Sequence, residues 1–333
     1  MPVTEPFASI DALHGPTVAA IGTFDGVHLG HRALLLRVKE EAEARSARSV
    51  ALVFREQPRA FFRPGELVSY LCDFETRLAI LGEIGIDEIV VLEFGFTIQK
   101  LSSVEFVRGL RDRIGLRALI VGPGARIGSD RARVEDLASP QSGGATPGGP
   151  HSGEATPGGA TSGRPGELAD IDFIAAPAEV IDGQEVSSSA IREAITKGNC
   201  EFAAKMLGRN YSITGVVATG ARRGRDLGFP TANVEPEITV VVPENGIYAT
   251  LAEVDGVTYG AATSIGVRPT FDADGGRTIE AFLLDFDGDL YTKRLRLEFV
   301  TRLRSEVAFG SVEQLVEQMN KDVEQTREIL AAR

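Results

Sequence analysis

The sequence contains only two cysteines, Cys72 and Cys200, among its 333 residues. Two thiols are too few for a disulfide framework or a thiolate metal site, so we expect a protein of a reducing compartment, the cytoplasm. Long apolar runs are also missing, because no segment reaches the roughly 20 apolar residues that a membrane-spanning helix needs. The first residues, Met1–Pro6, carry neither a basic region nor an apolar run. We therefore expect no export signal and no membrane partner.

Positive charge is in deficit. The 35 lysines and arginines are outnumbered by 47 aspartates and glutamates, which gives a net charge of −12. Nucleic acids and anionic membrane surfaces attract basic proteins, so we expect no nucleic-acid partner. An acidic chain can still contain a local basic pocket for the phosphates of a nucleotide. The hydrophobic content of 43% and the charged content of 25% are typical of a soluble globular protein.

The first half of the chain alternates between strand and helix patterns. A chain of 333 residues is too long for one ordinary core, so we expect two domains. Short apolar runs of this kind are typical of buried parallel strands, and their alternation with helices predicts an open, doubly wound parallel sheet of the α/β class. The expected strands are Val18–Gly22, Ser49–Phe54, Glu88–Glu93 and Leu116–Val121, and the expected helices are His31–Arg45, Phe74–Gly82 and Ser103–Ile114.

A tract rich in Gly, Pro, Ser and Thr interrupts this pattern at residues 139–166. One unit occurs twice in it, as Ser142-Gly-Gly-Ala-Thr-Pro-Gly-Gly149 and as Ser152-Gly-Glu-Ala-Thr-Pro-Gly-Gly159. Such a tract cannot bury enough apolar surface to offset the entropy of ordering it. We interpret it as a disordered insertion within a first domain that covers residues 1–186.

The second half has a different pattern. Helices at Ser188–Lys197 and Glu201–Leu207 are expected to form a connector over residues 187–208. From Tyr211 to Arg302, short alternating strands with Asp-Gly turns predict an antiparallel β-barrel, in which one strand is expected over Thr278–Phe286. Residues 209–333 are therefore expected to form a second domain.

A terminal helix is expected to complete that domain. Ser311 can cap its first turn, with Gln314 closing a capping box. Leu315, Met319 and Val323 form its apolar stripe, and for Met319 we expect core packing.

The most informative motif is Gly220-Ala-Arg-Arg-Gly-Arg-Asp-Leu-Gly-Phe-Pro-Thr-Ala-Asn233, which follows the expected strand Tyr211–Val217. Its glycines let backbone N–H groups approach a phosphate, and its arginines supply charge and forked donors. Thr231 and Asn233 can add oxygen ligands for a magnesium ion that travels with the phosphate. No Gly-Lys-Ser/Thr follows the glycines, so this is not a Walker A loop.

This motif closely resembles the signature of riboflavin kinases, the C-terminal half of the bacterial bifunctional riboflavin kinase/FAD synthetase family. The resemblance continues through Asn245–Ala249, Ser264–Phe271 and Ile279–Phe286 to the closing helix. It implies phosphorylation of riboflavin to FMN by ATP with Mg²⁺. It also implies that Glu280 is the catalytic base, that Thr231 and Asn233 bind ATP and magnesium, and that the phosphate loop is shaped by Gly224, Arg225, Gly228 and Pro230.

A second motif, Gly22-Thr-Phe-Asp-Gly-Val-His-Leu-Gly-His31, follows the first expected strand and opens the first helix. The N-terminus of a helix exposes unpaired N–H groups and a partial positive charge, which suit an anion. His28 and His31 can hydrogen-bond a triphosphate in the transition state for adenylyl transfer.

This second motif is similar to the adenylyltransferase motif of the same family, within the wider H-x-G-H nucleotidyltransferases. The similarity implies a Rossmann-like nucleotidyltransferase domain that makes FAD from FMN and ATP. His28 and His31 would be catalytic, and Gly22, Phe24, Asp25 and Gly30 would shape the ATP site. Val186-Ser-Ser-Ser-Ala-Ile-Arg192 resembles a further family motif in which Ser188 and Arg192 would reach the nucleotide, although a serine here can also cap the following helix.

Two positions depart from the family pattern. Gln57 replaces a histidine in Phe54-Arg-Glu-Gln-Pro58, and Gly122-Pro-Gly-Ala-Arg-Ile-Gly128 lacks the amide or carboxylate and both aromatic side chains of the family's FMN loop. Lost aromatic contacts weaken flavin binding by on the order of 1 kcal/mol each. These departures leave open whether FAD synthesis is impaired, whereas kinase activity does not depend on these residues.

Three alternatives remain open at this point. The chain could be a riboflavin kinase with a degenerate N-terminal domain, a non-catalytic flavin- or nucleotide-binding regulator, or an adenylyltransferase for another acceptor. The presence of Thr231, Asn233 and Glu280 argues against the regulator, because a binder needs no base. The complete kinase-like C-terminal half argues against the third alternative.

Overall fold

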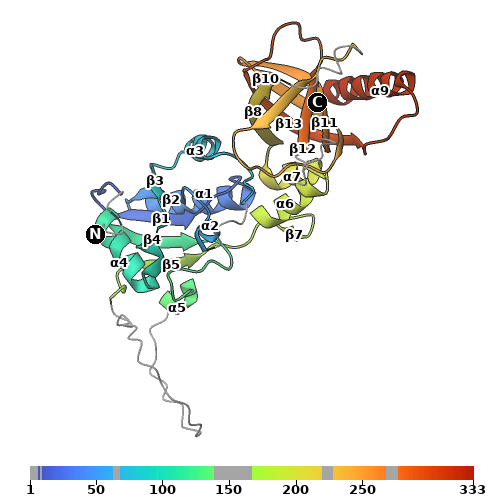
Figure 1. Cartoon of the computed structure of the whole chain (residues 1–333). Coiled ribbons are helices and arrows are strands. Elements are labelled where there is room, and N and C mark those ends of the chain that lie inside the picture. The colour runs from blue at the N-terminus through green and yellow to red at the C-terminus, as the bar shows by residue number, and fades with distance from the viewer. Residues whose placement is uncertain are drawn as a thin grey trace, which may run out of the picture. The chain divides into compact units, whose positions relative to one another are not determined.

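The computed structural model describes residues 7, 10–62, 68–95, 97–138, 167–219, 228–267 and 277–333 (Figure 1). The chain forms two compact units. The first comprises Met1–Phe24, Gly30–Gly65 and Leu78–Ala178, and the second comprises Asp25–Leu29, Glu66–Arg77 and Glu179–Arg333. Two short segments from the N-terminal half of the sequence thus belong with its C-terminal half.

The first unit is built on a parallel sheet of five strands in the order β3-β2-β1-β4-β5. The central strands are almost wholly buried, as expected for a parallel sheet with helices on its faces, which confirms the predicted α/β class. The strands are β1 (Thr17–Gly22), β2 (Arg48–Phe54), β3 (Glu88–Leu92), β4 (Leu116–Val121) and β5 (Asp172–Ala175).

The helices between these strands begin and end close to the predicted positions. Helix α4 (Ser103–Ile114) has a complete capping box, in which Ser102 accepts from the Glu105 N–H and Glu105 accepts from the Ser102 N–H. Gly115 ends it in the left-handed conformation, at φ 67°. The others are α1 (Leu29–Ala44), α2 (Pro58–Phe62), α3 (Phe74–Glu83), the 3₁₀ turn η1 (Ile98–Lys100) and α5 (Val134–Ala138).

The second unit contains a closed barrel in the order β10-β11-β12-β9-β8-β13, which confirms the predicted barrel. Neighbouring strands are antiparallel, and buried and half-buried residues alternate along them. Tyr211, Tyr248 and Phe299 fill the interior, with the Tyr248 and Phe299 rings edge-to-face at 5.5 Å. The strands are β8 (Tyr211–Ala218), β9 (Ala232–Pro236), β10 (Gly246–Val254), β11 (Val257–Val267), β12 (Arg277–Leu283) and β13 (Arg294–Arg304).

Short elements precede the barrel and a long helix follows it. The first are the hairpin β6 (Val180–Ile181) and β7 (Gln184–Glu185) and the helices α6 (Ser188–Thr196) and α7 (Cys200–Leu207). The last is α9 (Val312–Ala331), which packs beside the barrel (Figure 1).

Two local predictions need correction. Ser311 caps α9 by accepting from the Gln314 N–H, but the Gln314 side chain accepts from the Gly310 N–H, so no capping box closes. The strand predicted over Thr278–Phe286 ends at Leu283, because the chain turns at Asp285, whose φ is 56°. The residues that β12 contributes to the site lie before this turn.

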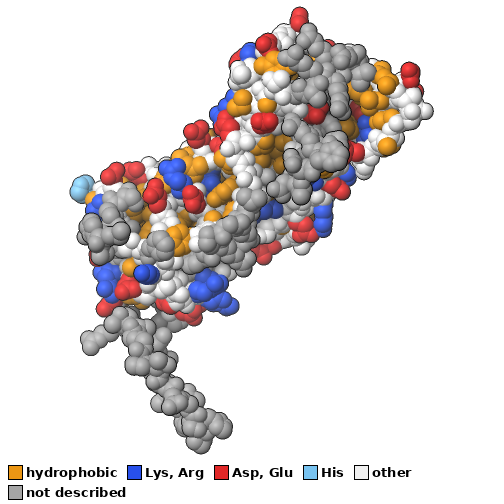
Figure 2. Space-filling view, viewed as in Figure 1, with side chains coloured by type: hydrophobic (Ala, Val, Ile, Leu, Met, Phe, Trp, Pro, Cys, Tyr) orange, Lys and Arg blue, Asp and Glu red, His pale blue; other side chains and the backbone are white. Residues whose placement is uncertain are grey.

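The surface and the cores agree with the composition. On the face shown in Figure 2, acidic and basic side chains are interspersed. Cys72 and Cys200 are both buried and free, and burial raises the pKa of Cys72 to about 11. The described part of the chain contains no helix long and apolar enough to cross a membrane. The repetitive tract at 139–166 lies outside the described residues.

Candidate functional site

One row of side chains crosses the outer face of the barrel. Strand pairing aligns Asn233 with Glu280, Glu280 with Ser264, Ser264 with Ile247, and Ile247 with Arg304. Residues directly opposite in neighbouring strands point to the same face of a sheet. Because Ile279 and Ala281 point into the barrel core, Glu280 between them points outward. The row therefore brings together Glu280 and Asn233, which the sequence predicts as base and metal ligand.

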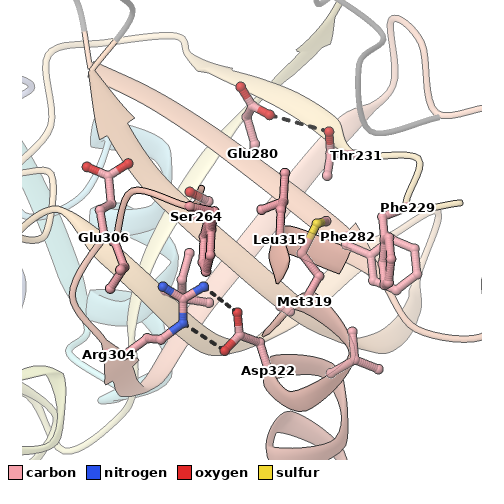
Figure 3. Close-up of a pocket in the computed structure, with 15 residues that line it drawn as sticks. Phe229, Thr231, Ser264, Glu280, Phe282, Arg304, Glu306, Leu315, Met319 and Asp322 are labelled. Atoms are coloured by element: carbon pink, nitrogen blue, oxygen red, sulfur yellow. Dashed lines mark hydrogen bonds and ion pairs between the residues drawn. The ribbon is translucent and has the colours of Figure 1, made fainter. Parts of the chain in front are cut away.

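Thr231 lies at the start of this row, just before β9. Its hydroxyl donates a hydrogen bond to Glu280 Oε2 at 3.4 Å (Figure 3). Phe229, two residues earlier, is buried and packs edge-on against Phe282 with the ring centroids 5.2 Å apart. The predicted loop residues Gly224 and Arg225 lie outside the described residues.

Two cavities meet at Thr231 and Phe282, which line both of them. The first has a volume of about 330 Å³ and lies between the outer row of the barrel and helix α9 (Figure 3). The second has a volume of about 710 Å³ and is lined by Gly228, Pro230 and the chain after β12. Both volumes fall within the roughly 300–1,000 Å³ typical of small-molecule sites. The arrangement suits two small ligands whose reacting ends meet beside Glu280.

Helix α9 lines the first cavity with its apolar stripe. Leu315, Met319 and Val323 are half-buried and border the cavity, so the expectation that Met319 packs in a core is wrong. The buried residues of α9 are polar instead: Asp322 and Thr326. The apolar stripe of the helix thus remains available to an apolar ligand.

Arg304 and Asp322 join the barrel to α9. Arg304 donates from Nε to Asp322 Oδ1 at 2.8 Å and from Nη2 to Oδ2 at 2.6 Å (Figure 3). Gln318 adds a third hydrogen bond to Asp322 at 2.9 Å. Arg302, two residues earlier in β13, is also paired, with Glu244 at 3.0 Å.

In the N-terminal motif, the chain passes from β1 into α1 through a turn with unusual backbone angles. Phe24, Gly26 and Val27 all have positive φ, at 51°, 79° and 38°. Such angles are uncommon for residues other than glycine and are true outliers for β-branched ones. Phe24 and Val27 are nevertheless fully buried, so the turn is tightly held.

The predicted residues of this motif take distinct places. Gly22 ends β1, Gly30 and His31 lie in the first turn of α1, and the His31 ring packs edge-on against Phe24 with the centroids 5.2 Å apart. His28 directly precedes α1 and is 5% exposed. Burial, assisted by the positive charges of Arg209 and Arg192, lowers the pKa of His28 to about 4. Its imidazole is therefore neutral at neutral pH.

Asp25 is the buried acid of the same turn. Its carboxylate forms an ion pair with Arg192 and accepts from the Leu71 N–H at 2.9 Å. Burial raises the pKa of Asp25, while the Arg192 charge opposes this shift. Arg192 also donates to the Ser69 carbonyl at 3.1 Å, and the Ser188 hydroxyl donates to the Asp25 carbonyl at 3.0 Å. In this structure Ser188 and Arg192 thus contact the turn, while Ser187 caps α6.

Comparisons with known proteins match both halves of the chain. The FAD synthetase family matches residues 10–144, and the riboflavin kinase family matches residues 207–330. The bifunctional riboflavin kinase/FMN adenylyltransferase of Pseudomonas fluorescens is 36% identical over 96% of this chain and 94% of its own. The protein of the same name from Listeria monocytogenes is 30% identical over 94% of this chain and 92% of its own.

The chain belongs to the bifunctional riboflavin kinase/FMN adenylyltransferase family. It is an enzyme of flavin biosynthesis with both family domains. A crystal structure from Streptococcus pneumoniae, described as that of a macrolide-efflux protein, has the same fold, with a TM-score of 0.81, 28% identity and coverage of 95% of each chain.

The two departures from the family pattern lie in the adenylyltransferase half. Gln57 is 9% exposed. Ile127 is buried in the core of the first unit and Ala125 packs against that core, so neither presents a flat face to a ligand. Gly124 lies at φ 66°, and no atom lies within 4 Å of the position that a β-carbon would take there. These three positions therefore offer no aromatic surface.

The sequence did not predict several of the residues that line the candidate site on the barrel. Phe282 shares the outward face of β12 with Glu280, because residues two apart in a strand point the same way, so alternation could have identified it. Ser264 lies opposite Glu280, and its place in the motif Ser264–Phe271 does not by itself single it out. Asp322 carried no local signal, because its partner Arg304 lies on another element.

Proposed function

We propose that the barrel phosphorylates riboflavin to FMN and that the N-terminal domain adenylylates FMN to FAD, in both cases with ATP and Mg²⁺. The observation that carries the kinase assignment is the meeting of two cavities at Thr231 and Phe282, beside the outward-facing Glu280. We assign the flavin ring to the apolar cavity under α9 and ATP to the larger cavity.

In the kinase step, Glu280 accepts the proton of the primary hydroxyl at the end of the ribityl chain. The hydroxyl oxygen forms a bond to the γ-phosphorus of ATP as the bond from that phosphorus to ADP breaks. The Thr231 hydroxyl, hydrogen-bonded to Glu280, holds the carboxylate toward the junction of the cavities. Exclusion of water by Phe229 and Phe282 strengthens these interactions.

Thr231 and Asn233 provide the oxygen donors that a hard cation prefers, and the row of strands places Asn233 beside Glu280. The described residues contain no cluster of three or more His, Cys, Asp or Glu side chains that could hold a metal. This donor set fits Mg²⁺ that arrives with the phosphates of ATP and keeps several waters. The ion would neutralise charge on the transferred phosphoryl group.

In the adenylyl step, a phosphate oxygen of FMN attacks the α-phosphorus of ATP and pyrophosphate leaves. The neutral imidazole of His28 donates a hydrogen bond to the phosphates, and His31 has the same assignment one helical turn further along. Gly22, Phe24, Asp25 and Gly30 shape the backbone around them. Both cysteines are buried thiols, which suits an enzyme that works in the cytoplasm, where ATP is available.

The test is to incubate the protein with riboflavin, ATP and Mg²⁺, and separately with FMN, ATP and Mg²⁺, and to separate the flavins by chromatography. Glu280→Gln should form no FMN from riboflavin yet retain the FMN-to-FAD reaction. Wild-type turnover of riboflavin by Glu280→Gln would refute the base assignment. Absence of FAD in both wild-type incubations would restrict the enzyme to the kinase reaction.

A further inference from the structure

The turn that carries His28 is strained, and strain of this kind persists only when the surrounding structure holds it. Positive φ at Phe24, Gly26 and Val27 places three of four consecutive residues in the left-handed region. A β-carbon on Gly26 would lie 2.8 Å from Leu71 Cδ1, so only glycine fits there. The contacts that maintain the turn are therefore part of the machinery that places His28.

Three polar contacts to this turn come from one stretch of chain, residues 188–209. The Ser188 hydroxyl donates to the Asp25 carbonyl, and Arg192 forms an ion pair with the Asp25 carboxylate. Arg209 donates from Nη2 to the Gly26 carbonyl at 2.7 Å. Residues 25–29 and 188–209 belong to the same compact unit, so these contacts lie within one body.

Apolar packing from the same stretch supports the turn. Gly208 ends α7 in the left-handed conformation at φ 72°, and a β-carbon there would lie 2.7 Å from Leu29 Cδ2. The glycine thus allows Leu29, the first residue of α1, to lie against the end of α7. Arg209 follows immediately, which directs its side chain to the turn.

We infer that Arg209 is a positioning residue for adenylyl transfer. Its hydrogen bond to the Gly26 carbonyl holds the Asp25–His28 turn in place, together with the contacts from Arg192 and Ser188. This inference rests on the proposed role of His28. Arg209 lies inside the region matched by the riboflavin kinase family, whereas the turn lies inside the region matched by the FAD synthetase family. A residue of the kinase region therefore serves the other reaction. Burial lowers the pKa of His28, and the positive charges of Arg209 and Arg192 lower it further, so the imidazole stays neutral.

The bifunctional chain supplies its own internal control, because riboflavin phosphorylation reports on the folding of the same unit. Arg209→Ala should lower kcat for FMN adenylylation by about 10- to 100-fold, the loss expected when a catalytic group moves by about 1 Å. The KM for ATP and the rate of riboflavin phosphorylation should change less than twofold. Arg209→Lys, which keeps one donor, should recover part of the lost kcat.

Arg113→Ala is the matched control, since Arg113 is also half-buried and donates to a backbone carbonyl, that of Ile10, at 2.6 Å. It should leave FAD formation unchanged. Equal loss of both activities in Arg209→Ala and Arg209→Lys, or wild-type FAD formation in both, would overturn the inference. His28→Asn distinguishes the proposed role of His28 from the positioning role of Arg209. If His28→Asn makes FAD at the wild-type rate, the proposed role of His28 is refuted. If His28→Asn is inactive while Arg209→Ala is fully active, only the positioning role of Arg209 is refuted.

Discussion

Burial of His28 makes stability depend on pH in a way that can be calculated. The unfolded chain binds a proton at this histidine near pH 6.5, whereas the folded protein does not until the pH falls to about 4. Over that window the unfolded state binds more protons, so the free energy of unfolding decreases as the pH falls. The full loss, over the whole shift, is about 3 kcal/mol at about 1.4 kcal/mol per pKa unit.

The measurement compares wild type with His28→Gln, which stays neutral at every pH. Between pH 7.5 and pH 5.5 the wild type should lose about 1.3 kcal/mol more of unfolding free energy than the variant, from the same linkage relation. The other titrating groups cancel in this difference. A lower limit of pH 5.5 keeps the protein above its isoelectric point of about 5.0.

Tyrosine fluorescence during urea unfolding reports on the correct part of the molecule. The chain has no Trp, and its five tyrosines, at positions 70, 211, 248, 259 and 291, all belong to the unit that contains His28. His14→Gln, at an exposed histidine, is the control and should follow the wild-type pH dependence. Parallel curves for wild type and His28→Gln would refute the claim that burial keeps His28 neutral.

Two further predictions concern the kinase cavity and the fold. Asp322→Asn should raise the KM for riboflavin by about tenfold with little change in the KM for ATP, because it removes the ion pair that holds α9 over the cavity and one of the two acceptors of Arg304, at a cost of about 1–3 kcal/mol. Glu317→Gln, which breaks an exposed pair with Lys321 on the same helix, should leave both KM values unchanged, and equal effects of the two substitutions would contradict the reasoning. Gly115→Ala should lower the free energy of unfolding of the first unit by more than about 2 kcal/mol, because its β-carbon would lie 2.2 Å from the Gly15 carbonyl oxygen in addition to the backbone strain. Gly124→Ala carries the same kind of strain with open space around it and should cost about 1 kcal/mol, so equal thermal shifts would refute the steric argument.

The sequence by itself determined the elements and the motifs. Buried parallel strands appear as apolar runs and barrel strands as alternation, so β1 to β4 and most ends of the predicted helices could be placed to within a few residues, whereas the edge strand β5 was not predicted. Glu280, Thr231 and Asn233 could be singled out because each stands in a contiguous motif, and their roles as base and magnesium ligands stay predictions. The predicted roles of Gly224 and Arg225 stay predictions, since both lie outside the described residues.

Only the tertiary structure decided which residues from distant segments of the chain contact one another at the sites. The pairing of Arg304 with Asp322, the cavity beside Met319 and the anchoring of the Asp25–His28 turn depend on contacts between elements far apart in the chain. Local periodicity reports which face of an element is buried, but not which partner it meets there. The capping box predicted at Ser311 is also absent for a reason of tertiary geometry, because the Gln314 side chain accepts a hydrogen bond from the Gly310 N–H and not from the Ser311 N–H. Which of several nearby donors a side chain bonds to depends on the distances and angles between them in three dimensions. The sequence specifies these distances and angles only through the whole fold.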